Sequence, residues 1–463
     1  MVIMHYFLGF PPYRSGGLTR YCVDLMDIQR KKGDSVIALW PGEISFISKK
    51  TQIKKRKNIK GIINYELSNP LPVPLDEGIE DIKAYTRCCD FSVYETFLKK
   101  IKPDVVHIHT LMGIHKEFFD VTKKLKIKTM FTSHDYFGIC PKVTLYKQGN
   151  VCTEDHGCMD CIQCNSTALS LKKIQIMQSG LYRNLKDSFL LKKIRKNHRK
   201  NFFDEEIVNI NSASTEDEQK KANEYKKLRN YYIKMFQKID LIHFNSSITK
   251  SIYEDYFELP ENKVVTISHK NIRTRHKSVE NKKSNKLRIT CLAPARPFKG
   301  YNVLIKALDE LWDSGKCNFM LKMFNTVPDE RKYLKVVENG FTQSDLPEIM
   351  SNTDVLVATS IWYETFGFTV LEALSFGIPV IVSDHVGAKD IVGNAGIIVK
   401  AGDISELKNV IEALINDPDN LSKLKDNAKK KEVKTWKQFV DENYELYHKL
   451  INYWLLQEKK ILK

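Results

Sequence analysis

The sequence predicts an α/β fold of two Rossmann-like, doubly wound domains that face each other across a cleft, with a helical insertion in the first domain and a C-terminal helix that crosses back to it. Three observations predict this fold. Short β-branched apolar runs alternate with helical patterns in both halves of the chain, which is typical of parallel sheets with right-handed crossovers. A polar stretch without periodicity separates the halves. The length of 463 residues also exceeds what one hydrophobic core usually holds.

The first half holds four strand candidates, at residues 2–10, 35–40, 104–110 and 129–135. They are rich in β-branched residues, and helical patterns such as SVYETFLKKIKP separate them. We therefore predict an N-terminal domain over residues 1–272. Residues 165–235 are charged and helical in pattern, and with the cysteine-rich stretch before them they predict an insertion at about 140–235.

The second half repeats the alternation. Apolar runs predict strands at residues 287–294, 318–324, 354–360, 379–384 and 395–400, with amphipathic helices between or after them. They predict a C-terminal domain over residues 287–432, joined to the first by a linker at 273–286. Residues 433–463 predict an amphipathic helix, rich in aromatic residues, whose apolar face packs on the first domain.

Composition and charge narrow the class of protein. Apolar residues make up 42% of the chain, and the formal net charge of +17 favours an anionic partner such as a phosphorylated substrate, nucleic acid or a membrane surface. No apolar run approaches the ~18 residues needed to span a bilayer. The apolar start lacks a basic leader and is interpreted as the first strand, so we expect a cytoplasmic protein. Its ten cysteines are then expected to be reduced thiols or metal ligands.

Two glutamates flank a glycine-bearing turn in the stretch WYETFGFTVLEALSFGIPVIVSD, residues 362–384. Glu364 follows a strand candidate, and Glu372 lies eight residues later on a predicted helix. If the segment between them is mostly helical, the carboxylates lie ~12 Å apart, about the separation of the two sugars in a nucleoside diphosphate sugar. A diphosphate would bind the helix N-terminus, with the transferred sugar on Glu364 and the ribose on Glu372. The alternative is a capped helix with two solvated glutamates.

Polar and glycine residues follow three other strand candidates, at the sheet edge where α/β proteins bind ligands. Arg296 and Lys299 suit a diphosphate, although a basic solvent-facing loop has the same pattern. Consecutive Gly16 and Gly17 open a helix, a geometry that binds phosphate or hydroxyl groups but also occurs in simple turns. His134 suits either a hydrogen bond to a substrate hydroxyl or a structural role.

Together these motifs resemble the retaining GT-B glycosyltransferases of family 4. The resemblance rests on the Glu-x7-Glu block ETFG…LEA…G.PVI.SD, the KG loop, the N-terminal GG loop and DVVHIHT…SHD…CP, and it covers nearly the whole chain. It implies three catalytic residues, which are Glu364, His134 and Lys299. The residues expected to bind substrate are Gly16, Gly17, Asp135, Arg296, Gly367, Phe368, Thr369 and Glu372.

By resemblance, Glu364 contacts the donor sugar beneath its reacting face, and His134 touches the same sugar from the first domain. Lys299 holds the diphosphate, Glu372 holds the ribose, and the backbone N–H groups of residues 367–368 meet sugar or phosphate. The family usually carries an arginine five or six residues before the lysine. Here those positions are Pro294 and Ala293, and Arg296 lies nearer to the lysine.

The resemblance implies a hexosyltransferase-type glycosyltransferase. Such an enzyme moves a sugar from a nucleoside diphosphate sugar to a glycan or lipid-linked acceptor with retention of configuration, here in surface polysaccharide biosynthesis. The first domain would face the acceptor and the second the donor, and catalysis would require no cofactor. Two alternatives stay open: a sugar-nucleotide epimerase of the same fold, and a catalytically inactive protein that binds sugar nucleotides or glycans.

Five of the cysteines fall within 25 residues, in CPKVTLYKQGNVCTEDHGCMDCIQC. The C-x2-C-x2-C spacing suits the thiolate ligands of a structural zinc, and the alternative is a cluster of reduced thiols without metal. The predicted ligands are Cys140, Cys152, Cys158 and Cys161, with Cys164 and His156 in reserve.

Residues 171–200 carry ten lysines and arginines and one acid, Asp187, with Leu and Ile between them. This pattern is typical of a helix on an anionic leaflet, so we expect peripheral binding to the cytoplasmic face of the membrane. A solvated basic face that packs on the domain is the alternative. No nucleic-acid recognition motif accompanies the charge, so nucleic acid is not an expected partner.

Overall fold

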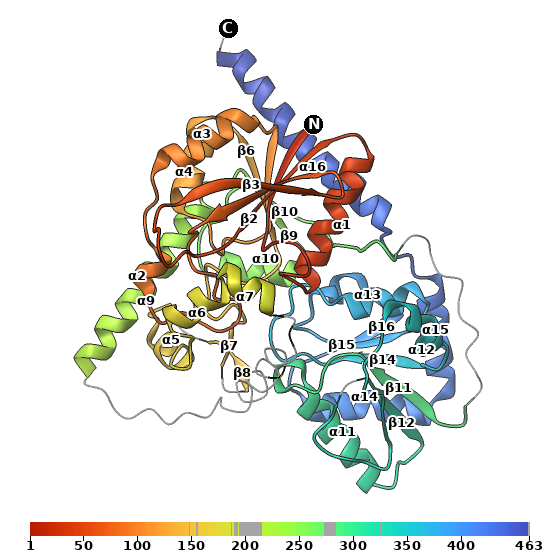
Figure 1. Cartoon of the computed structure of the whole chain (residues 1–463). Helices are drawn as coiled ribbons and strands as arrows, with labels where there is room; N and C mark the ends of the chain where they lie inside the picture. The colour runs from red at the N-terminus through yellow and green to blue at the C-terminus, as the bar shows by residue number, and fades with distance from the viewer. Residues whose placement is uncertain are drawn as a thin grey trace.

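The computed structural model describes residues 1–147, 149–153, 156–186, 188, 193, 215–272, 284–324 and 326–461. Figure 1 shows two lobes, each built on a sheet with helices against it, and a C-terminal helix that runs back along the first lobe. The predicted α/β fold of two doubly wound domains is confirmed. Most of the predicted linker at 273–286, and most of the basic stretch beyond residue 186, lie outside the described residues.

Within the described part of the chain, the first sheet has eight strands in the order β10-β9-β6-β5-β1-β2-β4-β3. Every neighbouring pair is parallel except β3–β4. In β1, Ile3, Met4 and Tyr6 are fully buried, as expected of a strand covered on both faces. The strands are β1 (Val2–Tyr6), β2 (Ser35–Pro41), β3 (Gln52–Ile59), β4 (Ile62–Ser68), β5 (Val105–Ile108), β6 (Lys128–Ser133), β9 (Leu241–Phe244) and β10 (Asn262–Val264).

Helices pack against this sheet, and helices with a short hairpin form the insertion (Figure 1). α3 (Phe91–Ile101) shows how the sequence sets the ends of a helix. The Asp90 side chain accepts a hydrogen bond from the Ser92 N–H (2.9 Å), and the helix ends at Lys102, whose backbone is left-handed. The other elements of this lobe are α1 (Gly17–Lys31), α2 (Ile82–Tyr85), α4 (Lys116–Lys124), β7 (Tyr146–Lys147), β8 (Asn150–Val151), α5 (Met159–Cys164), α6 (Leu171–Met177), α7 (Gly180–Leu185), α9 (Thr215–Phe236) and α10 (Ser247–Glu254).

The second sheet, counted over the described residues, has six strands, all parallel, in the order β13-β12-β11-β14-β15-β16. Arg288 ties its two central strands together, because its Nε and Nη2 donate to the Asp354 carboxylate (2.9 and 2.8 Å). Burial opposes ionisation of Asp354, but hydrogen bonds from Arg288 and Lys425 outweigh it and hold the pKa of this carboxyl below its usual range. The strands are β11 (Leu287–Cys291), β12 (Phe319–Met323), β13 (Leu334–Val336), β14 (Val355–Ala358), β15 (Val380–Ser383) and β16 (Gly396–Val399).

Short and long helices flank the second sheet. The 3-10 segments are η1 (Pro297–Lys299), η2 (Gln343–Asp345), η3 (Gly387–Ile391) and η4 (Gly393–Ala395). The α-helices are α11 (Tyr301–Asp313), α12 (Leu346–Ser351), α13 (Phe368–Ser375), α14 (Ile404–Asn416) and α15 (Pro418–Lys430).

The C-terminal helix α16 (Trp436–Ile461) returns to the first lobe, as the sequence predicts (Figure 1). Phe439 and Tyr447 on its apolar face are fully buried. The Gln29 amide donates to the Tyr447 hydroxyl (3.2 Å), and the Lys32 ammonium pairs with Asp441 (2.9 Å). None of the helices among the described residues combines the length and the apolar character needed to cross a bilayer.

Candidate active site

The predicted site residues lie where strands of both sheets end, at the contact between the two lobes. His134 follows β6, and Glu364 lies beyond the end of β14. Hydrogen bonds join the lobes here: Thr365 Oγ1 donates to the His134 carbonyl (3.2 Å), and Ser246 Oγ donates to the Thr365 carbonyl (2.9 Å). Because α/β sheets bind ligands at such strand ends, this contact marks the candidate site.

Glu364 and Lys299, both predicted catalytic residues, form an ion pair. Lys299 Nζ lies 2.9 Å from Glu364 Oε1, and Glu364 Oε2 accepts a hydrogen bond from Ser360 Oγ (2.7 Å). Lys299 Nζ also lies 4.8 Å from the centre of the Trp362 ring, within cation–π range. Burial opposes ionisation of Glu364, but Lys299 and the two hydrogen bonds outweigh it, so the pKa of the Glu364 carboxyl lies below its usual range. The site therefore carries fixed charges of both signs.

The segment between Glu364 and Glu372, the two glutamates predicted to bind the donor, is helical only in its second half. α13 begins at Phe368, whereas Glu364 lies in an extended segment that forms a parallel bridge with Val386. Gly367 makes the turn between them with a φ of +107°, and a Cβ there would lie 2.8 Å from a Val386 methyl group. Glycine is therefore required at this position. The turn brings the N-terminus of α13, with its free N–H groups, next to Glu364 in the chain.

Gly300 fixes the position of Lys299. It follows η1 with a φ of +75°, and a Cβ at this residue would lie 1.7 Å from the Thr359 carbonyl oxygen. The backbone after β11 therefore touches the backbone after β14. Only glycine permits this approach, which places Lys299 beside Glu364.

Gly300→Ala should lower the free energy of unfolding by about 1–3 kcal/mol, because the backbone must move to relieve the clash. It should also reduce activity by separating Lys299 from Glu364. Gly315→Ala is the matched control: Gly300 precedes α11 and Gly315 lies just beyond its other end, with a φ of +81°, but a Cβ at Gly315 would meet nothing within 4 Å. Urea unfolding and turnover of both variants test this. Equal effects in the two variants would show that backbone strain alone, and not the contact with Thr359, makes Gly300 necessary.

A cavity of about 360 Å³ lies between the lobes, beside the N-terminal half of α13. Glu372 is only 4% exposed and borders this cavity. Its Oε1 accepts a hydrogen bond from Gln343 Nε2 (2.6 Å) and lies 3.3 Å from His269 Nε2. Five of the predicted residues line the cavity, namely Gly16, Gly17, Phe368, Thr369 and Glu372.

Gly16 and Gly17 open α1 at the edge of this cavity. Gly16 has a φ of +115°, which favours glycine, and no side chain caps the helix. A Cβ at either position would meet nothing within 4 Å. The start of α1 therefore leaves room beside the cavity for a phosphate or hydroxyl ligand.

The remaining predicted residues are not among those that line the cavity, as far as the described residues define it. The His134 ring packs edge-to-face on Tyr21, a lining residue, at 4.7 Å between ring centres. Burial raises the pKa of Asp135 to about 6, against a hydrogen bond from the Phe137 N–H (2.9 Å). Arg296 precedes η1, three residues before the lysine of the ion pair.

Sequence reasoning missed the other residues that line the cavity. Arg20, Tyr21 and Asp24 follow Gly17 at helical spacing, and this periodicity is a signal that would have found them. His269, Lys270, Asn271, Phe341, Gln343 and Trp436 come from other segments. Asn271 Nδ2 donates to Gln343 Oε1 (2.8 Å), and only the tertiary fold brings these two residues together.

Thiols of the cysteine cluster influence one another's ionisation. A hydrogen bond with Cys158, burial and the nearby Cys140 raise the pKa of Cys161 far above its usual value. Burial, Cys140 and Cys152 raise the pKa of Cys164 to about 12. These thiols therefore lie close enough to affect one another's ionisation, as metal ligands do. Over the described ranges, however, the one group of three potential ligand atoms all within 4.8 Å of one another is formed by His5, His107 and His109.

Comparisons with known proteins agree with this arrangement. Residues 272–431 match the family model described as Glycosyl transferases group 1. An MMP α-(1→4)-mannosyltransferase of Mycolicibacterium hassiacum is 25% identical over 230 residues, which are 46% of this chain and 54% of that protein. O-antigen chain mannosyltransferase B of Escherichia coli is 28% identical over 113 residues, 24% of this chain and 26% of that protein. The matched region thus spans about half of the first relative and a quarter of the second.

The similarity of this chain to solved structures extends over both lobes. Sucrose-phosphate synthase from Thermosynechococcus elongatus, a GT-B protein, superposes over 97% of this chain and 99% of its own, with a TM-score of 0.54 and 13% identity. At this identity the likeness concerns the fold. The chain therefore has the GT-B fold, and its residues 272–431 match the family model of the group 1 glycosyltransferases.

Proposed function

We propose that the protein is a retaining, hexosyltransferase-type glycosyltransferase that moves a sugar from a nucleoside diphosphate sugar to a glycan or lipid-linked acceptor. One observation carries the proposal. The Lys299–Glu364 pair and the cavity with the buried Glu372 lie on the two sides of the turn that begins α13, between the lobes. This arrangement suits a ligand with an anionic centre and two hydroxylated ends.

Each part of the donor has a partner in this arrangement. The nucleoside occupies the cavity, where the Glu372 carboxylate accepts hydrogen bonds from the ribose hydroxyls. The diphosphate binds the N-terminus of α13 and the Lys299 ammonium. The transferred sugar lies at Glu364 and His134, and Asp135 and Arg296 are further residues that we propose bind the substrate. Gly16 and Gly17 face the phosphate and the acceptor from the first lobe.

Charge development explains what these groups do. As the anomeric bond breaks, negative charge grows on the departing diphosphate and positive charge on the sugar. Lys299 and the N–H groups of α13 stabilise the former, and the ionised Glu364 stabilises the latter. Closure of the lobes excludes water, so that the acceptor receives the sugar. These groups supply the charge that catalysis needs, and we propose that no cofactor is required.

The donor assay tests the proposal. UDP-, GDP- and ADP-sugars are screened by thermal shift, because a bound ligand raises the melting temperature by mass action. Product analysis of the stabilising donor follows, with and without a glycan acceptor. Acceptor-dependent transfer with the anomeric configuration kept supports the proposal. An altered sugar nucleotide without acceptor would indicate an epimerase, and binding without any product would indicate a binding protein.

We further propose that the first lobe works at an anionic membrane face in surface polysaccharide biosynthesis. The most exposed large apolar side chains of the described residues lie there: Phe46 is 65% exposed, Ile47 98% and Leu181 72%. The loop that carries the first two joins α6 and α7 through the Ile44 N–H, which donates to the Gln178 carbonyl (3.3 Å). Four exposed lysines lie in the same segments: Lys49 and Lys50 follow Ile47 in the loop, and Lys172 and Lys173 lie on α6. Apolar side chains among lysines suit an anionic leaflet.

Ile47→Glu combined with Leu181→Glu should weaken sedimentation with anionic vesicles by about tenfold. Each substitution replaces an apolar side chain that would insert into the membrane by a negative charge that the anionic lipids repel. Ile398→Glu, at an apolar residue 45% exposed in the second lobe, is the control and should leave sedimentation unchanged. Equal binding of the double variant and the parent protein to the vesicles would show that this surface does not contact the membrane.

We also propose a structural zinc on the cysteine cluster, through Cys140, Cys152, Cys158 and Cys161. Its support is that Cys158 and Cys140 raise the pKa of Cys161, and that Cys140 and Cys152 raise the pKa of the neighbouring Cys164. Metal analysis of the purified protein, with and without substitution of Cys158 by Ser, tests this. One equivalent of zinc that is lost in the variant supports the site, and metal-free protein of full stability contradicts it.

A further inference from the structure

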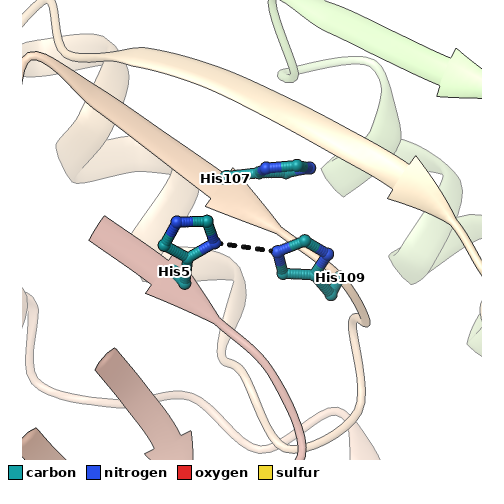
Figure 2. Close-up of side chains that lie close together, drawn as sticks. All are labelled: His5, His107 and His109. Atoms are coloured by element: carbon teal, nitrogen blue, oxygen red, sulfur yellow. Dashed lines mark hydrogen bonds between the residues drawn. The ribbon is translucent and has the colours of Figure 1, made fainter. Parts of the chain in front are cut away.

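Histidines gather at the centre of the first sheet. His5 on β1, His107 on β5 and His243 on β9 are fully buried. His109 and His134 follow β5 and β6 at the strand ends that face the candidate site. Figure 2 shows His5, His107 and His109 close together, with the hydrogen bond that joins His5 to His109.

A backbone carbonyl fixes one end of a hydrogen-bond chain through these rings. His243 Nε2 lies 2.7 Å from the Val265 carbonyl oxygen, which can only accept, so Nε2 carries the proton. Nδ1 of the neutral ring then accepts from Thr132 Oγ1 (3.0 Å). The Thr132 hydroxyl has donated its one proton, so it accepts from His107 Nε2 (2.7 Å). His107 Nδ1 is therefore an acceptor and takes the proton of the Tyr447 hydroxyl (2.6 Å).

The chain continues toward the site. The Tyr447 oxygen is left to accept from the Gln29 amide nitrogen (3.2 Å). Gln29 Oε1 then accepts from His5 Nε2 (2.7 Å), and His5 Nδ1 accepts from His109 Nε2 (3.0 Å). His109 Nδ1 in turn accepts from His134 Nε2 (3.2 Å). Because each step has one direction, the carbonyl at the far end determines the tautomer of every ring up to His134.

Each ring of the chain must be neutral to accept as well as donate a hydrogen bond, and burial keeps the rings neutral. Burial lowers the pKa of His5 and of His243 to about 4, although each donates a hydrogen bond. It lowers the pKa of His134 to about 3. The pKa values of His107 and His109 lie well below their usual range, because burial and the neighbouring rings both oppose a positive charge.

We propose that this chain holds His134 in one tautomer, with the proton on Nε2 and a lone pair on Nδ1, and that Gln29 and Tyr447 are the positioning residues that select it. Among the described residues, none forms a hydrogen bond with His134 Nδ1. The ring lies against Tyr21, which lines the cavity. His134 therefore receives a group that donates a hydrogen bond, such as a hydroxyl, and repels a carboxylate. In the proposed reaction, on which this last step rests, that group is a hydroxyl of the donor sugar.

A metal ion is the competing explanation for this group of rings, since ligand atoms of His5, His107 and His109 lie within 4.8 Å of one another. Both ring nitrogens of each of these three histidines already bond to protein atoms. A metal would have to break the chain that the structure contains. The hydrogen-bond chain accounts for all six nitrogens without an added group.

Tyr447 determines which tautomer of His134 is present, because it holds the Gln29 amide in one orientation. In Tyr447→Phe the amide is free to rotate and to donate to His5 Nε2. That rotation reverses each bond from His5 to His134 and puts the proton on His134 Nδ1. The phenyl ring still fills the buried site on α16. Tyr444→Phe is the matched control, since Tyr444 lies on the same helix and bonds to Asp34, outside the chain of rings.

Ring-nitrogen NMR of the full-length protein, labelled with [15N]histidine and free of ligand, measures the tautomers directly. The signals of His134 are assigned by their loss in His134→Gln. In the parent protein and in Tyr444→Phe, Nε2 should be protonated and Nδ1 unprotonated. In Tyr447→Phe, and in Gln29→Met as a second variant should the first not fold, both tautomers should appear. If they become equally populated, the Kd of the donor rises about twofold.

Several results would overturn the proposal. These are a parent protein with the proton on His134 Nδ1 or on both nitrogens, and a folded Tyr447→Phe variant that keeps the single tautomer. Another is a shift of the His5, His107 and His109 signals on adding Zn²⁺ that EDTA reverses, which would establish a metal site instead. The NMR result does not depend on the reaction. A confirmed tautomer in a protein that binds no sugar nucleotide would refute only the proposed function.

Discussion

Lys299→Met should lower kcat by about 10²–10³-fold, because it removes the fixed cation beside which negative charge develops on the departing diphosphate. The substitution also leaves Glu364, whose Oε1 lies 2.9 Å from Lys299 Nζ in the parent protein, without its counter-charge. Single-turnover kinetics with the donor found by thermal shift measure the chemical step. Lys299→Arg retains the charge and should recover part of the rate.

Lys306→Met is the matched control, since Lys306 is an exposed lysine on α11, seven residues further along the chain. Its kcat should equal that of the parent protein. A Lys299→Met variant whose kcat stays within twofold of the parent value would show that Lys299 does not contribute to catalysis.

The same substitution should change how stability depends on pH. In the parent protein the pKa of Glu364 is held below its unfolded value, so this group stabilises the fold above the unfolded pKa and loses that contribution as pH falls through the folded pKa. Without Lys299 only burial acts on the carboxyl, and its pKa rises. Urea titrations should therefore find the variant's deficit largest near neutral pH and smaller below pH ~4. A deficit independent of pH would contradict the ion pair.

Glu372→Ala should weaken binding of the donor by about 10–100-fold, because a charged acceptor of hydrogen bonds is lost from a buried site. The free nucleoside diphosphate should lose the same factor, since the ribose is common to both ligands. Glu364→Ala should weaken binding of the donor but spare the nucleoside diphosphate. Isothermal titration of both ligands against both variants separates the two roles.

Glu348→Ala provides the control for surface charge, because Glu348 is an exposed glutamate on α12 of the same lobe. It should bind both ligands like the parent protein. Unchanged affinity of Glu372→Ala for the nucleoside diphosphate would show that the ribose does not contact Glu372.

Much of the fold is predictable from the sequence, because a buried parallel strand reads as a short apolar run and the helices between strands have the 3.6 period. The run at 318–324 contains β12, for example, and the run at 354–360 contains β14. The β3–β4 hairpin was not anticipated. β3 is the edge strand QIKKRKNI, a mostly polar stretch with an irregular register, and such a strand lacks the apolar signal.

The candidate site is only partly predictable, for a physical reason. Residues that follow strands of one sheet must converge, so Glu364 and Lys299 could be inferred from their positions. The environment of Glu372 could not be inferred, because His269 and Gln343 come from irregular segments that only the tertiary fold brings to it. The hydrogen-bond chain through five histidine rings is likewise invisible in the sequence, where these histidines lie in four separate strand segments.

A crystal structure with the nucleoside diphosphate of the stabilising donor tests the central claim most directly. The account predicts the nucleoside in the cavity of about 360 Å³, with its ribose hydroxyls on the Glu372 carboxylate. It also predicts the phosphates at the N-terminus of α13, within reach of the Lys299 ammonium. A nucleotide bound outside the space between the lobes, with the Glu372 carboxylate still joined to Gln343 and His269, would contradict it.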